Sequence, residues 1–227
     1  MRLFKRRAVP QAPDADFLQF LAEYGLVAFD HQLRLSEVVG DRDWQLDQDR
    51  GVLRFGDDIV LDAQILGSSS DRSQTWLWAW ANPSVGDELT REARRARELG
   101  AASAASVFTA PEFPISRVGD DHALALCAAG LLGADAYYRC PYPGGAAIVV
   151  VDCAQVHAQR SEADVPSLLL EAVQAIPDAV SRVSIARYLD TNAITFAPAD
   201  DGITLGNGTS LRFDSAGRLV EIASSDG

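Results

Sequence analysis

An alternation of tryptophan with smaller apolar residues over positions 75–82, Thr-Trp-Leu-Trp-Ala-Trp-Ala-Asn, limits the fold of this chain more than any other feature. Successive side chains of a β-strand point to opposite faces of the sheet. Trp76, Trp78 and Trp80 are therefore predicted to share one face. Each indole can bury about 150–250 Å², so the strand that carries them needs a packed face. We expect a sheet with these tryptophans in its core.

Short segments of strand-like composition surround the tryptophan motif. Turns rich in Gly, Asp and Ser separate them, so consecutive strands are expected to be antiparallel. The strands predicted in the first half of the chain are 44–46, 52–55, 59–66 and 75–81, and those in the second half are 146–151, 193–197, 203–205, 209–213 and 219–222.

Apolar residues at three- and four-residue spacings predict helices elsewhere. The predicted helices are 14–39, 85–99, 122–132, 161–176 and 179–189. The pattern indicates an α+β fold, in which an antiparallel meander is covered by helices and a smaller helix-and-hairpin portion follows. We expect a mobile tail over 1–13, a core domain over 14–157, and a C-terminal portion over 158–227 that packs on the core or continues the same domain.

The charge balance bears on the partner. The chain has 32 acidic and 20 basic residues, a net charge of -12, and four of its basic residues lie in the first seven positions. Nucleic-acid binding depends on a concentrated basic surface, so we expect no nucleic-acid partner. Strong acidity would instead steer association with a basic protein.

The chain is expected to act in the cytoplasm. Its start, Met-Arg-Leu-Phe-Lys-Arg-Arg, is followed by proline-containing sequence rather than by the apolar region of a signal peptide, and no stretch of eighteen apolar residues occurs that could span a membrane. Cys127, Cys140 and Cys153 form no C-x-x-C pair. Free thiols in a reducing compartment are the expected state.

Recognisable catalytic motifs are absent from the sequence. Lys5 is the only lysine, which excludes a P-loop, a kinase lysine and Schiff-base chemistry. Three histidines occur without the spacing of a zinc site, and no G-x-S-x-G motif is present. We therefore expect no metal and no cofactor. His122 is interpreted as a residue of a first helical turn, although a catalytic base beside Asp120 and Asp121 is the alternative.

The tryptophan strand leaves two interpretations open. The rings can form core, or they can form a platform for a flat ring or a sugar. In the second case polar aromatic tips would come from across a groove. The candidate binding residues are Trp76, Trp78, Trp80, Tyr137, Tyr138, Arg139 and Tyr142. Arg139 can hold a carboxylate or phosphate in such a groove, or it can seal the edge of the sheet by pairing with a neighbouring carboxylate.

The motif also resembles that of a known family, a group of small bacterial proteins classed as a domain of unknown function and marked by a TWLWAWAN-like strand. Segments 44–47, 63–67, 122–125 and 134–139 are similar to the family pattern as well. Cys140 departs from it, since a glycine-like residue is expected there. The resemblance spans 14–225 and implies no catalytic or binding residue.

Two functions remain open at this stage. The sequence favours a non-catalytic binding or interaction module, of the kind that neutralises a basic protein partner. The alternative is a small-molecule-binding protein or an enzyme that uses the Trp/Tyr groove.

Overall fold

The computed structural model describes residues 12–158 and 160–224. The predicted tail, apart from Ala12 and Pro13, lies outside the described residues. The fold is α+β, as predicted, with a larger and a smaller antiparallel sheet. Within the described residues no helix is both long and apolar enough to cross a membrane.

The larger sheet has seven antiparallel strands arranged around its longest one, β3 (Ile59–Ser70). The order is β1-β2-β3-β4-β5, and β7 pairs with β3 as well as with β6. The other strands are β1 (Trp44–Asp47), β2 (Val52–Phe55), β4 (Thr75–Trp78), β5 (Glu112–Pro114), β6 (Ala136–Tyr142) and β7 (Gly145–Val151). Strands β5 and β6 were not predicted.

The first two tryptophans of the motif belong to the core, but strand β4 ends before the third. Trp76 and Trp78 on β4 are fully buried, and their rings meet edge to face with centroids 5.3 Å apart. The prediction for Trp80 was wrong, because the chain enters a 3-10 turn, η1 (Ala79–Ala81). Trp80 is half-buried there, and the Arg97 guanidinium lies 4.4 Å from its ring centroid.

Gly67 on β3 makes room for these indoles. It pairs with Trp78 across the sheet, at a point where the register with β7 shifts. A Cβ atom at this position would lie 2.5 Å from the Trp76 ring and 2.5 Å from the Leu77 carbonyl oxygen. Only glycine fits without a shift of the backbone.

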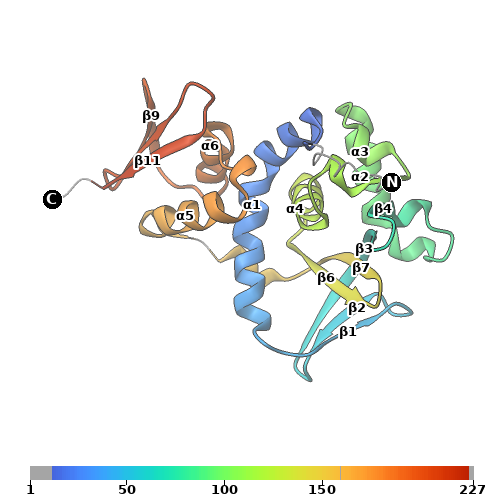
Figure 1. The fold of residues 1–227 in the computed structure, drawn as a ribbon. Helices are drawn as coiled ribbons and strands as arrows, with labels where there is room; N and C mark the ends of the chain where they lie inside the picture. The colour runs from blue at the N-terminus through green and yellow to red at the C-terminus, as the bar shows by residue number, and fades with distance from the viewer. Residues whose placement is uncertain (1–11, 159, 225–227) are drawn as a thin grey trace, which may run out of the picture.

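Helix α1 (Ala15–Val39) lies between the two parts of the molecule. Figure 1 shows α4 (Asp121–Leu132) and the larger sheet on one side of it, and α6 (Arg182–Thr191) on the other. Gly130 of α4 permits a close approach, because a Cβ atom there would lie 2.4 Å from the Tyr24 carbonyl oxygen of α1. The N-cap of α4 is Asp120, whose carboxylate accepts the Ala123 N–H at 2.7 Å.

Three helices differ from their predicted ranges. The helix expected at 161–176 begins only at Val165, after a 3-10 turn. The helix expected at 85–99 is α2 (Arg91–Ala102), preceded by a 3-10 turn, η2 (Asp87–Leu89). Gly100 lies inside α2. A side chain at this position would clash with Phe108, which packs directly over the helix there. The helix expected at 179–189 is α6, which begins at Arg182. The remaining helices are α3 (Ser106–Thr109) and α5 (Val165–Ala175), and the remaining 3-10 turns are η3 (Ile115–Arg117), η4 (Ala154–His157), η5 (Glu162–Asp164) and η6 (Pro177–Ala179).

The smaller sheet is a four-stranded meander near the C-terminus, and it was predicted as such. Its order is β11-β10-β9-β8, with β8 (Phe196–Ala199), β9 (Gly202–Leu205), β10 (Ser210–Phe213) and β11 (Leu219–Ala223). Strand β8 begins later than expected. Helix α1 contacts α5, α6 and η6, so the C-terminal portion packs on the core. Its division into a separate domain stays a prediction.

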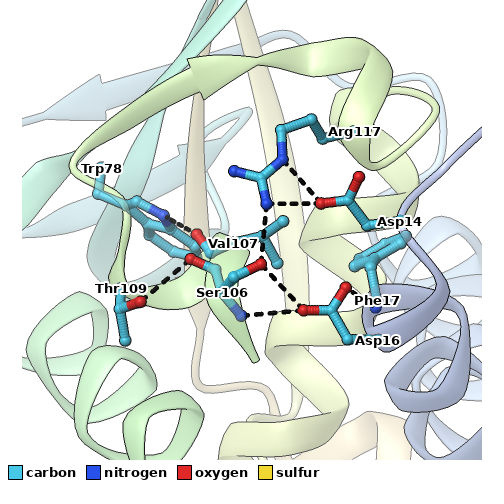
Figure 2. Close-up of polar contacts among 8 residues, drawn as sticks. All are labelled: Asp14, Asp16, Phe17, Trp78, Ser106, Val107, Thr109 and Arg117. Atoms are coloured by element: carbon cyan, nitrogen blue, oxygen red, sulfur yellow. Dashed lines mark hydrogen bonds and ion pairs between the residues drawn. The ribbon is translucent and has the colours of Figure 1, made fainter. Parts of the chain in front are cut away.

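A polar network fixes the start of α1, and Figure 2 shows its members. Arg117 Nε donates to Asp14 Oδ2 at 2.7 Å, and Arg117 Nη2 donates to Ser106 Oγ at 2.8 Å. Ser106 in turn donates its N–H and hydroxyl to Asp16 Oδ2. Asp14 takes the N-cap position but makes no side-chain hydrogen bond to the helix, because Arg117 holds its carboxylate. The network ties α1 to α3 and η3.

We expect the three cysteines to resist modification in the folded protein. All are free and buried, and burial raises the pKa of Cys127 and raises that of Cys140 to about 12. Both access and thiolate formation are therefore suppressed. Ellman's reagent at pH 8 should label the native protein slowly and label all three thiols at once in urea. Rapid labelling of Cys127 without denaturant would contradict this prediction.

Candidate functional site

The seven predicted binding residues do not meet in one cavity. Trp76 and Trp78 are fully buried and present no surface to a ligand. Trp80 lies beside α2, and Tyr142 lies on β6 with 48% of its surface exposed. Tyr137 lines a mainly apolar pocket, whereas Trp80 and Tyr142 line two other, smaller pockets.

Arg139 and Tyr138 belong to the packing of β6. Arg139 Nε donates to Asp121 Oδ2 at 3.0 Å, and Ser69 Oγ donates to the same oxygen at 2.5 Å. Burial alone would raise the pKa of Asp121, but these hydrogen bonds hold it below its usual value. Tyr138 packs edge to face on Phe55, with centroids 4.8 Å apart. Arg139 thus pairs with a neighbouring carboxylate, as in the alternative in which it seals the edge of the sheet.

The pocket that Tyr137 lines has a volume of about 460 Å³ and lies between α1, α4 and the end of α5. We call it the α1–α4 pocket. Most of its lining is apolar. The side chains that form its walls include Phe17, Leu18, Leu21, Phe29, Val118, Ala123, Leu126, Ile176 and Pro177.

The wall formed by residues 175–178 depends on a glycine and a proline. Pro177 has no N–H to continue α5, and the chain turns there into η6. Ala179, at the end of η6, is fully buried against Gly25 of α1, where an added Cβ atom would lie 2.8 Å from the Ala179 Cβ. Helix α1 runs through Gly25 without interruption, and the glycine lets the C-terminal segment approach the helix closely.

One end of the α1–α4 pocket is polar. His122 Nδ1 lies 3.2 Å from the Tyr137 hydroxyl, and Gln32 Oε1 accepts the Tyr137 backbone N–H at 3.3 Å. Burial, followed by the charges of Asp120 and Asp121, raises the pKa of Tyr137. The phenol is therefore neutral at physiological pH, and it serves as a hydrogen-bonding group rather than as a nucleophile.

The two carboxylates in the lining of this pocket are negatively charged. Asp120 and Asp178 belong to its lining, and no Lys or Arg occurs among the described residues that line it. An anionic ligand would meet two carboxylates without a compensating cation. The arrangement favours an apolar group whose polar end is neutral or positively charged.

A family model for a family of unknown function, DUF6882, matches residues 18–154, more than half of the chain. The chain belongs to this family. The matched DUF6882 region contains the seven-stranded sheet, α4 and nearly all of α1, so it supplies most of the α1–α4 pocket. The wall at 175–178 lies outside it. Neither the curated proteins nor the solved structures contain a match to this chain.

A second constellation joins the DUF6882 region to η4 and was not predicted. His157 Nε2 lies 2.6 Å from Asp135 Oδ1, and Asp135 Oδ2 accepts the Cys153 N–H at 2.7 Å. The His31 ring meets the His157 ring edge to face, with centroids 5.0 Å apart. Among the described residues no cluster of three or more side chains could hold a metal ion. The two histidines are far apart in the sequence, and no local motif announces their contact.

The buried carboxylate of Asp30 was also not predicted. Asp30 is 2% exposed, and its carboxylate lies 2.5 Å from Arg160 Nε and 3.4 Å from Arg34 Nε. The Tyr188 hydroxyl donates to it at 2.9 Å. Through these contacts the DUF6882 helix α1 holds both the segment that follows η4 and helix α6.

We expect His31 to make stability depend on pH below neutrality. Burial, followed by the neighbouring His157, lowers the pKa of His31 below its ordinary value of 6.5. The unfolded chain then binds more protons than the folded one, so the free energy of unfolding is full above pH 6.5 and falls as the pH drops toward the folded pKa. Urea unfolding at pH 7.5, 6.5 and 5.5 measures this slope.

The His31→Gln variant should show a shallower decline than the wild type over the same pH range. A His31→Gln profile parallel to that of the wild type would contradict the assignment.

Proposed function

We propose that the protein is a non-catalytic binding module of a bacterial, cytoplasmic family, and that its ligand enters the α1–α4 pocket with an apolar body and a neutral or cationic polar end. The observation that carries this proposal is the combination of mostly apolar walls with Asp120 and Asp178 and no lining cation. Apolar pockets with a few converging polar groups are the usual form of a binding site.

Several features support binding without catalysis. The pocket's described lining offers one histidine and one phenol, and the raised pKa of Tyr137 makes that phenol a poor nucleophile. Three buried, free cysteines suit a reducing compartment such as the cytoplasm. The tryptophan motif, which resembles that of a bacterial family, serves packing at Trp76 and Trp78.

The Trp/Tyr groove is the weaker candidate for a small-molecule site or an enzyme. Its two central tryptophans are fully buried, and Arg139 is already paired with Asp121. No observation on those residues favours a ligand over packing.

Titration with two small probes of opposite charge tests the proposal. Hexylamine and hexanoate have the same apolar chain, and calorimetry at about 150 mM salt screens the long-range attraction of the acidic chain for the amine. We expect hexylamine to bind at least about tenfold more tightly than hexanoate, a difference of about 1.4 kcal/mol.

Pocket-filling variants provide the control. Ala123→Phe and Leu18→Trp fill the pocket from α4 and from α1, and each should abolish hexylamine binding. Ala102→Phe, at an exposed position near the end of α2, should leave it unchanged. Circular dichroism confirms that each variant is folded. Equal affinity for the two probes, or unchanged binding by both folded pocket variants, would contradict the proposal.

A further inference from the structure

An exposed apolar stripe on α5 leads toward the α1–α4 pocket. Leu170 and Val173 are 56% and 39% exposed, although both are large apolar side chains. Residues three apart share a helix face, and α5 ends at Ala175, which lines the pocket together with the next residue, Ile176. We call Leu170 and Val173 the α5 stripe. Exposed apolar side chains that line up beside a pocket are a mark of an interaction surface.

The surroundings of the α5 stripe are strongly acidic. Residues 161–181 contain four carboxylates and no Lys or Arg; the acidic residues are Glu162, Asp164, Glu171 and Asp178. Asp178 also lines the pocket, where Asp120 lies on the α4 side. Glu171 is next to Leu170 in α5 and Asp178 lines the pocket, so negative charge accompanies both parts of the surface, whereas Asp164 interacts with Arg34 and Arg160.

We propose that the α5 stripe and the α1–α4 pocket form one docking surface for a basic amphipathic segment of a partner protein. The inference rests on the proposed function of the pocket and names the class of its partner. A helix with apolar residues at i, i+3, i+4 and i+7 presents a stripe of this kind, with Lys or Arg beside it. Its apolar side chains would contact Leu170, Val173 and the pocket, and its cations would face the carboxylates.

Charge complementarity selects this occupant over two others. A second copy of the chain would bring a further net charge of -12 to the same acidic face. An anionic membrane surface would meet the same repulsion. A cationic segment gains from the field of the chain, which also speeds its encounter with the surface.

Fluorescence anisotropy with synthetic peptides tests the inference on the full chain. The probe is a labelled 14-residue peptide of Leu and Lys with Leu at the helical spacing. A peptide of the same composition in permuted order and one with Glu in place of Lys are the controls. We expect the probe to bind at least about tenfold more tightly than either control.

Two variants locate the binding. Leu170→Ser combined with Val173→Ser should weaken binding of the probe at least tenfold, because it removes the α5 stripe. Val60→Ser changes a similarly exposed side chain, 49% exposed, on β3, and it should have no effect. All of these positions are exposed enough that the variants should remain folded, which circular dichroism confirms.

Three results of these peptide and variant experiments would overturn the inference, and a fourth concerns the chain's own N-terminal segment. The first is equal binding of the permuted peptide, which would indicate charge alone. The second is that the stripe variant binds the peptide probe as tightly as the wild type does. In that case, hexylamine binding by the same variant shows whether the pocket still binds a small ligand, as the proposed function requires. The third is a dimer of the wild type that the stripe variant loses, which would assign the surface to a second copy.

The chain's own basic start is the remaining competitor. Replacing Arg2, Lys5, Arg6 and Arg7 with Ser should change the affinity for the amphipathic and permuted peptides by the same factor. If the replacement instead raises the affinity tenfold or more for the amphipathic peptide alone, the N-terminal segment of the chain itself occupies the docking surface. That result would overturn the assignment to a partner protein.

Discussion

Replacing Asp30 with Ala should lower the free energy of unfolding by about 3–5 kcal/mol, the usual result of breaking a buried ion pair from one side. Asp30 is 2% exposed, and its carboxylate is the charge partner of Arg34 and Arg160. Without it, two guanidinium groups stay in a poorly solvated site without their contacting carboxylate, and only the more distant charge of Asp164 still acts on both. The Tyr188 hydroxyl also loses its acceptor. The loss is large because the remaining groups are left unpaired.

Equilibrium unfolding in urea measures this change, and a surface ion pair of the same helix is its matched control. Glu23 lies 2.9 Å from Arg187, and both side chains are largely exposed. Glu23→Ala should therefore cost less than about 1 kcal/mol. Equal losses for Asp30→Ala and Glu23→Ala would contradict the assignment of Asp30 as the centre of a buried cluster.

Trp78→Ala should be comparably severe, with a loss of about 3–5 kcal/mol in the free energy of unfolding. The indole is fully buried between Trp76 and Phe108, at centroid distances of 5.3 and 5.6 Å. Its Nε1 donates to the Val107 carbonyl oxygen at 2.9 Å, so truncation also leaves a buried acceptor unpaired (Figure 2). The cavity and the lost hydrogen bond act together.

Trp80→Ala is the control, since it removes an identical side chain from the same motif. Trp80 is half-buried and its specific contact is the Arg97 guanidinium, an interaction worth about 0.5–1 kcal/mol at exposed sites. It should lose less than half of what Trp78→Ala loses. Trp78→Phe separates the hydrogen bond from the packing. Equal losses at positions 78 and 80 would mean that the strand continues through the motif.

The behaviour of this motif illustrates what the sequence could predict. Alternation correctly assigned Trp76 and Trp78 to one buried face, because side-chain period is a local property of a strand. Alternation says nothing about where a strand ends. The end at Trp78 depends on the packing of residues 79–81 against α2, which the period does not contain. The period likewise does not show that α2 continues past Leu99, where Gly100 lets Phe108 pack directly on the helix.

The site was harder to predict than the fold. Tyr137 and His122 were both considered from the sequence, but their hydrogen bond joins β6 to α4. The wall at 175–178 meets α1 through Gly25 and Ala179, which are far apart in the sequence. The charged cluster at Asp30 likewise draws its arginines from α1 and from position 160. The Asp30–Arg34 pair has the local i,i+4 spacing of a helical ion pair, but the other contacts carry no local pattern, so only the folded chain shows them.

The most direct test of the binding account is a methyl NMR titration of the full-length protein with hexylamine. The account predicts saturable shifts at the methyl groups of Leu18, Ala123 and Ile176, which belong to the lining of the α1–α4 pocket, and no shifts at Val60 and Val220, which are exposed elsewhere. Ala123→Phe should remove the shifts at Leu18 and Ile176. Saturable shifts at Val60 or Val220 with the pocket methyl groups unchanged would contradict it.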